Sequence, residues 1–267
     1  MSVPLAYASI ILIWSTTPLA VRWSTEGTGF AFAVLARMLI GVLVAAFMLR
    51  LGRMAIPLHA RARRAYLVSG LGLFGTMMLT YWGARHVGSG LISVLFGLSP
   101  LVAGVFAACW LGERSLTPMK IGGMLLSAAG LALIFVHDGP SAGSNETAGV
   151  CALLGAVVAS SASLVGMKRI GDDSPPLATT VGAIVVALPL FALVWFATDG
   201  TLPRALPLRT GGAIAYLGVF GSAIGFALYF YVVRHLEASK VALITLITPV
   251  ANSPTCQPWV SYRSGWL

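Results

Sequence analysis

The sequence predicts an all-α fold, a polytopic transmembrane helical bundle. Three observations support this: 58% of the 267 residues are hydrophobic, only 9% are charged, and the mean hydropathy is +0.90. A soluble domain carries about 25% charged residues, and a disordered chain has low hydrophobicity, so both classes are excluded. Since each crossing needs about 20 apolar residues, the chain has room for about nine or ten spans and little else.

Apolar runs of membrane length follow one another with short polar connections. Thr117-Pro118 suits a helix start, because proline at the first helical position loses no needed hydrogen bond. Asp138-Gly139-Pro140 and the stretch Asp172 to Pro176 break the chain between runs. Helices are therefore expected at residues 3–22, 30–49, 66–84, 89–111, 118–136, 148–168, 177–197 and 211–232, with a ninth run from Ser239 to about Ala251.

The net charge of +9 is explained by topology rather than by nucleic-acid binding, because lysine and arginine lie mainly in the short connections. With the N-terminus inside, the inner connections hold eleven of these residues and the outer ones hold four. We therefore expect an inner (cytoplasmic) membrane protein with a cytoplasmic N-terminus. The inner residues are Arg50, Arg53, Arg61, Arg63, Arg64, Arg114, Lys120, Lys168, Arg169, Arg234 and Lys240, and the outer ones are Arg22, Arg85, Arg204 and Arg209.

The chain contains an internal repeat with an offset of 149 residues. Residues 81–86 and 230–235 both carry an aromatic pair followed by Arg-His, and a proline, Pro100 or Pro249, lies fourteen residues further on. The same offset relates Gly72 to Gly221 and Ser99 to Thr248. Five spans separate equivalent positions, so the halves are expected to be inverted repeats, an arrangement that supports alternating access in secondary transporters. A duplicated scaffold without transport is the alternative.

The stretch from Tyr81 to Val136 resembles the EamA-like family of the drug/metabolite transporter superfamily. The residues that carry the resemblance are Ala84 to Gly90, Leu98 to Leu101, Leu111 to Arg114, Lys120 to Gly123 and Ala129-Gly130, and Arg37 also fits the family pattern. The second half is similar from about Gly149 to Pro249. The resemblance implies a ten-helix carrier with cytoplasmic termini, often an exporter of amino acids or other small metabolites.

The pattern changes after Pro249. The repeat would place a second Gly-Glu pair at 261–262, where the chain has Ser261-Tyr262, and residues 251–267 contain no apolar run of membrane length. The expected division is therefore a first five-helix repeat at 1–137, an incomplete second repeat at 148–250 and an aberrant polar tail at 251–267. A truncation or frameshift near residue 251, which removes the tenth helix, is the expectation for this end.

The candidate substrate-binding residues lie within the spans. Pro100 and Pro249 are expected to kink helices beside Ser99 and Thr248, because proline removes a backbone donor. A purely structural kink is an equal alternative. Trp14 with Thr17, Tyr81 and Tyr229 are expected to line a pocket for a solute, although aromatic residues also serve as interfacial anchors.

Arg37 is the one basic residue well inside a predicted span, about 10 Å from its outer end. A charge at this depth usually faces a partner or a wet cavity, and Arg37 has the geometry to bind a substrate carboxylate. A structural arginine is the alternative. Glu113 and Arg114, at the end of the fourth span, are predicted to form a structural ion pair or to take part in gating.

No catalytic residue, cofactor or metal site is expected. The sequence contains no G-x-S-x-G, H-E-x-x-H or P-loop motif, and its four histidines share no ligand spacing. Small residues at Gly155, Ala159 and Ser163 predict close helix packing, within the chain or in a homodimer. The predicted function is a secondary carrier of small organic metabolites in contact with lipid. The alternatives are a non-transporting membrane subunit and an inactive truncated carrier.

Overall fold

The computed structural model describes residues 2–87, 89–112, 122, 126, 144–198, 200–203, 206–238 and 240–244. Regular secondary structure in this part of the chain is entirely helical, which confirms the all-α prediction. The elements are α1 (Val3–Ser24), α2 (Phe30–Leu51), α3 (Ala60–Gly83), α4 (Ser89–Phe96), α5 (Ser99–Leu111), α7 (Ser144–Ile170), α8 (Pro176–Thr198), α9 (Leu208–Tyr216), the π-helix η1 (Leu217–Ile224) and α10 (Gly225–His235).

Local chemistry explains several of these limits. Pro4 lies in the first turn of α1, and the Nδ1 atom of His59 accepts a hydrogen bond from the backbone N–H of Ala62 at the start of α3. Gly112 adopts a left-handed conformation with φ of 67° where α5 ends, a backbone geometry that glycine adopts without a steric penalty. The predicted break at 172–176 is confirmed, because α7 ends at Ile170 and α8 begins at Pro176.

Four predicted helices differ from the observed ones by more than two residues or by a break. α7 begins at residue 144 rather than 148. α3 begins at residue 60 rather than 66, because the basic residues after His59 continue the capped helix. The predicted span 89–111 is divided into α4 and α5, with a break directly before Ser99-Pro100. The predicted span 211–232 lies within Leu208–His235, and η1 interrupts it. The predicted helix 118–136, most of the ninth run and the tail 251–267 lie outside the described residues.

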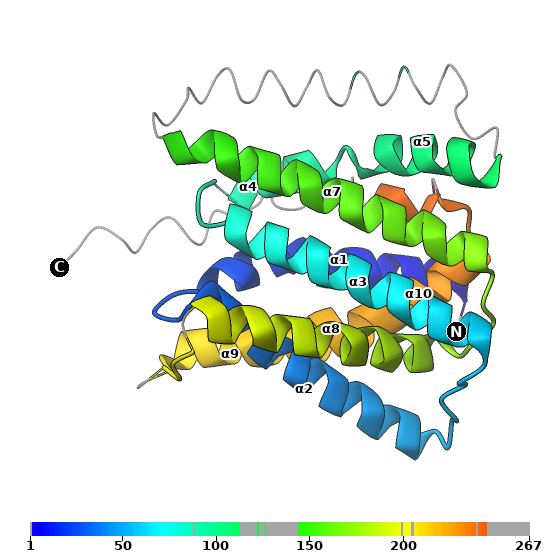
Figure 1. Cartoon of the computed structure of the whole chain (residues 1–267), viewed down its shortest axis with the longest axis horizontal. Helices are drawn as coiled ribbons and strands as arrows, with labels where there is room; N and C mark the ends of the chain where they lie inside the picture. Colours follow the sequence, from blue (N-terminus) through cyan, green and yellow to red (C-terminus); the bar gives the residue numbers. More distant parts are fainter. Residues whose placement is uncertain are drawn as a thin grey trace.

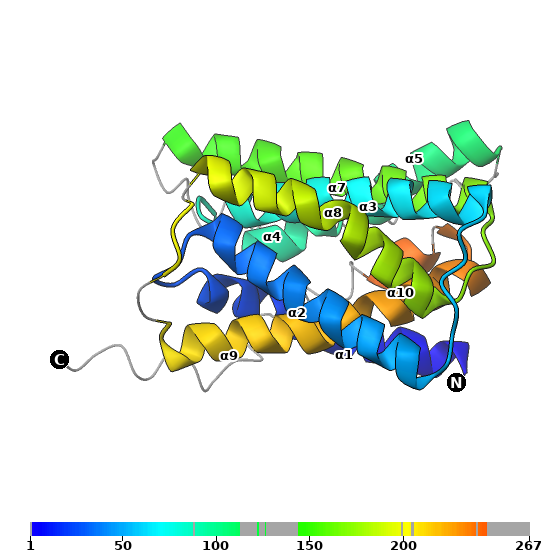
Figure 2. The ribbon, with the colours of Figure 1, turned by 60° about the horizontal axis from the view of Figure 1, so that its bottom comes forward.

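The helices run roughly side by side along the bundle (Figure 1). α3 packs against both α7 and α8, α2 packs against α8 and η1, and α1 packs against α9 and α10. Figure 2 shows α3 and α7 in one layer of the bundle and α1 and α9 in the other. Helices from the first and second halves of the chain therefore contact one another throughout the bundle.

The connections gather at two ends of the bundle. At the near end, which holds the N-terminus and lies on the right of Figure 1, the His59 Nε2 atom is 3.7 Å from Asp172 Oδ1. There Arg234 also donates a hydrogen bond of 2.9 Å to the carbonyl oxygen of Ser174. At the far end, the Arg85 guanidinium lies 5.4 Å from the centre of the Phe30 ring. Arg85 and Arg234, which the repeat makes equivalent, thus lie at opposite ends.

The outer surface of the bundle is apolar. Leu12, Leu43, Phe47, Leu193 and Phe196 are all more than 65% exposed, which suits contact with lipid rather than with water. Five helical segments among the described residues are long and apolar enough to cross a membrane: Val3–Ser24, Phe30–Leu51, Glu146–Ile170, Pro176–Thr198 and Leu208–His235. α3 is equally long, but it begins with three arginines, Arg61, Arg63 and Arg64, and it also contains four glycines and two threonines. These features support a multi-pass membrane protein.

Candidate functional site

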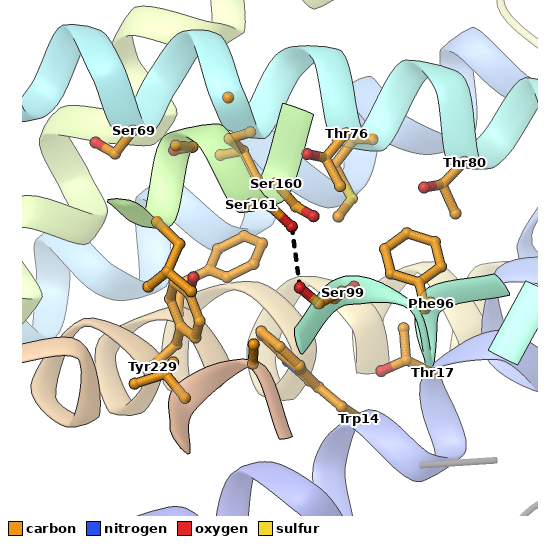
Figure 3. A pocket seen from close by; sticks show the side chains of 18 of the residues that line it. Trp14, Thr17, Ser69, Thr76, Thr80, Phe96, Ser99, Ser160, Ser161 and Tyr229 are labelled. Carbon is orange, nitrogen blue, oxygen red and sulfur yellow. Dashed lines mark hydrogen bonds between the residues drawn. The ribbon is translucent and has the colours of Figure 1, made fainter. Parts of the chain in front are cut away.

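A cavity of about 210 Å³ lies midway along the bundle. Helices α1, α3, α4, α5, α7 and α10 line it, together with one residue of α2 and the short helical stretch at 241–242. Figure 3 shows the polar and aromatic side chains of these helices converging on one space. The cavity is therefore lined by elements from both halves of the chain.

An aromatic wall forms one side of the cavity. The rings of Trp14 and Tyr229 lie 5.4 Å apart at an angle of 31°, and Phe226 meets the Trp14 ring edge-on at 6.4 Å. A Cβ atom added to Gly225 would lie 3.0 Å from Trp14 Nε1, so the absence of a side chain there lets the indole approach α10. This wall offers flat apolar faces to a solute.

Hydroxyl groups line much of the remaining surface. Several of them donate hydrogen bonds to helix carbonyls, as Ser69 does to Ala65 and Thr17 does to Ile13, and so retain their acceptor capacity. The Thr80 Oγ1 and Ser99 Oγ atoms are buried and have no hydrogen-bond partner in the described part of the chain. The hydroxyl-bearing residues of the lining are Thr17, Ser69, Thr76, Thr80, Ser99, Ser160, Ser161, Ser163 and Tyr229.

The break between α4 and α5 places Ser99 at the cavity. The backbone N–H of Leu98 donates to Leu95 and that of Leu101 donates to Leu98, so the helix ends and restarts within a few residues. Pro100 lies in the first turn of α5, where its missing N–H is not needed. The Ser161 hydroxyl donates to the carbonyl oxygen of Ser99 at 3.4 Å, and this bond joins α7 to the break (Figure 3).

Arg37 is 1% exposed and contributes the charged group of the lining among the described residues. Its Nε–H donates to Ser222 Oγ at 2.9 Å, and Nη1 donates to the hydroxyl of Tyr81 at 3.3 Å. A Cβ atom added to Gly221 would lie 3.1 Å from Arg37 Nη2. The π-helix therefore provides a hydroxyl partner and leaves room for the guanidinium.

The structure brings many of the predicted site residues together. Trp14, Thr17, Arg37, Ser99 and Tyr229 all line the cavity. Tyr81 is fully buried behind Arg37, and Pro100 is buried at the start of α5 without lining the cavity. Glu113, Arg114, Thr248 and Pro249 lie outside the described residues, so their roles stay predictions.

The sequence interpretation missed the hydroxyls of α3 and α7. Ser69, Thr76 and Thr80 are separated by seven and four positions, a spacing that places them on one helical face. The stripe at Gly155, Ala159 and Ser163 packs against α3, since a Cβ atom on Gly155 would lie 3.2 Å from Leu79 and one on Gly75 would lie 3.6 Å from Ala159. This confirms packing within the chain, and Ser163 also lines the cavity.

No group of three His, Cys, Asp or Glu side chains with the geometry of a metal site occurs in the described ranges. The arrangement instead suits reversible binding of a small solute by hydroxyls, aromatic rings and a guanidinium. A multi-pass helical bundle with such a cavity at mid-height has the architecture of a membrane transport protein.

The chain belongs to the EamA-like transporter family, whose sequence profile matches residues 3–136 and 147–253. This finding confirms the family resemblance identified in the sequence. The protein is therefore a multi-pass membrane transporter.

Individual relatives support this assignment. The chain is 29% identical over 254 residues to a probable terminal-alkyne amino-acid exporter of Streptantibioticus cattleyicolor, across 90% of this chain and 80% of that protein. It is 25% identical over 250 residues to the uncharacterized inner membrane transporter YedA of Escherichia coli K12, across 92% of this chain and 78% of YedA. A crystal structure with 20% identity has a TM-score of 0.76 over 96% of this chain and 87% of its own, which shows the fold alone.

Proposed function

We propose that the protein is a secondary carrier that exports a small organic solute, such as an amino acid, by alternating access. The observation that supports this proposal is the mid-bundle cavity. The Trp14–Tyr229 wall and the hydroxyls of Thr80 and Ser99 line it, and these two hydroxyls have no hydrogen-bond partner among the described residues. A non-transporting membrane subunit needs no such cavity. The amino-acid exporter among the relatives supports the choice of substrate.

Alternating access requires two units that move relative to each other around the site. We propose that these units are the inverted repeats, at 1–137 and 148–250. The placement of Arg85 and Arg234 at opposite ends supports this, since inverted repeats place equivalent residues on opposite sides. The break before Pro100 supplies a joint at which the lining is able to rearrange.

The proposed location is the inner membrane, with the N-terminus in the cytoplasm. The described basic residues at the near end include Arg61, Arg234 and Lys240, and the positive-inside rule assigns that end to the cytoplasm. The inner membrane location of YedA supports the same assignment.

The test is solute counterflow in proteoliposomes made with the purified protein. The panel is the twenty standard amino acids and L-propargylglycine, which carries a terminal alkyne. We expect saturable counterflow of at least one of them, and a strong reduction in the Trp14→Ala variant because the aromatic wall is lost. Trp110→Ala is the matched control, since Trp110 is 41% exposed and lies outside the cavity. Absence of saturable flux for the whole panel contradicts the proposal.

A further inference from the structure

We infer that the cavity selects solutes that carry a carboxylate, and that Arg37 is the group that binds it. This inference rests on the proposed function and names the substrate class of the same site. It begins from an imbalance of charge around Arg37. Among the described residues, no acidic side chain lies in an ion pair with its guanidinium.

The hydroxyl partners of Arg37 orient the charge without neutralising it. Ser222 and Tyr81 are neutral, and both lie in the interior with exposures of 0%. A buried charge is stable in proteins when a counter-charge or water compensates it, and it is costly otherwise. Since the guanidinium lines the cavity, a bound anionic group is able to supply that compensation.

Among the described residues, the guanidinium has N–H donors that make no hydrogen bond. Its bonds to Ser222 and Tyr81 occupy two of the five N–H groups that an arginine carries. The planar arrangement of these donors matches the two oxygens of a carboxylate. Because the two hydroxyls hold the side chain in place, a solute carboxylate meets a donor group that is already oriented.

The rest of the lining does not favour an organic cation. Within the described lining there is no aspartate or glutamate, and the polar side-chain groups other than Arg37 are hydroxyls and the indole N–H of Trp14. The ammonium group of an amino acid has weaker partners here, namely hydroxyl oxygens and the faces of Trp14 and Tyr229. The expected substrate class is therefore monocarboxylates and amino acids, and it excludes amines that lack a carboxylate.

The experiment measures ligand-dependent thermal stability of the purified full chain in detergent, so that it does not depend on transport. The probes are two matched pairs: sodium phenylacetate with phenylacetamide, and L-phenylalanine with L-phenylalaninamide. We expect each carboxylate to raise the unfolding temperature in a saturable way, and each amide to bind roughly tenfold to hundredfold more weakly. Equal responses to acid and amide, or no response to either acid, overturn the inference.

Variants separate the role of Arg37 from its effect on folding. Arg37→Gln should abolish the preference for the acid. Arg37→Lys should keep the preference but bind the acid more weakly, because lysine retains the positive charge and lacks the planar set of N–H donors that matches a carboxylate. Arg50→Gln is the matched control, since Arg50 is exposed at the end of the same helix. If Arg37→Gln does not fold, the wild-type comparison and Arg37→Lys still decide the inference. If the protein shows counterflow but the thermal assay shows no preference for the acids, only the inference is refuted. If the acids bind but no counterflow occurs, only the proposed function is refuted.

Discussion

α3 and the segment Leu208–His235 are related by the 149-residue offset, yet they cross the bundle with different backbones. α3 is α-helical from Ala60 to Gly83, whereas the π-helix η1 interrupts the second segment at Leu217–Ile224. π-helical turns widen a helix locally and are frequent at functional sites. The wider turn occurs in the segment that contacts the buried charge.

The residues that face the two segments also differ. In α3, a Cβ atom on Gly70 would lie 2.7 Å from Val186 of α8. In η1, Gly221 faces Arg37 of α2. The same offset relates Arg37 to Val186, and it relates Gly221 to Gly72, two residues after Gly70. One half thus packs an aliphatic side chain where the other half places a guanidinium. The charge of the site therefore belongs to the α2–η1 interface, whereas the α3–α8 interface is held by apolar packing.

The strongest test of this comparison moves the charge to the other interface. Val186→Arg should destabilise the protein by about 3 kcal/mol, the usual cost of arginine near the centre of a membrane helix. Val186 packs against Gly70 of α3, which has no side chain to accept a hydrogen bond from the guanidinium. The measurement is the yield of monodisperse protein and its unfolding temperature in detergent. Val186→Met is the control, and equal stability of the two variants would show that the interfaces are interchangeable.

The next test compares the two glycine contacts. Gly70→Ala should lower stability by about 1–2 kcal/mol, because the new Cβ would lie 2.8 Å from the backbone oxygen of Ala183, which is held in a helix. Gly221→Ala should change stability less, since the nearest atom is 3.1 Å away on the side chain of Arg37. The measurement is again the unfolding temperature.

Gly211→Ala serves as the reference for this test, because among the described residues no atom outside the adjoining helix backbone lies within 4 Å of its added Cβ. That variant should gain up to about 1 kcal/mol from helix propensity alone. If Gly221→Ala lowered the stability more than Gly70→Ala, the α2–η1 contact would be the more tightly packed of the two, contrary to this prediction.

The sequence was sufficient to predict the helical class and most helix limits, because hydropathy and turn residues act locally. The bounds of α1 and α8 differ from the predicted ones by two residues or fewer. The sequence also drew attention to Trp14 and Arg37, which line the cavity, because a charge deep in a span is unusual and therefore informative.

Other features depend on long-range contacts that a single sequence does not display. The hydroxyls of Ser69 and Ser163 resemble ordinary helix-packing residues, and only the packing of α3 on α7 brings them to one cavity. Likewise, nothing in Leu217–Ile224 distinguishes a π-helix from an apolar α-helix. Only the structure shows that this segment places Ser222 within hydrogen-bonding distance of Arg37.

The smallest expected effect concerns the hydroxyls that hold Arg37. Ser222→Ala removes the acceptor at 2.9 Å and should cost about 1 kcal/mol, whereas Tyr81→Phe removes a longer bond of 3.3 Å and should cost less. Both variants keep the charge, so both should still prefer phenylacetate to phenylacetamide, with Ser222→Ala binding it more weakly than Tyr81→Phe. Thermal titration of the two variants beside the wild type measures this order. If the hydroxyls served only to stabilise the fold, the variants would lose thermal stability but bind phenylacetate as tightly as the wild type, and the η1 interface would then be structural like that of α3.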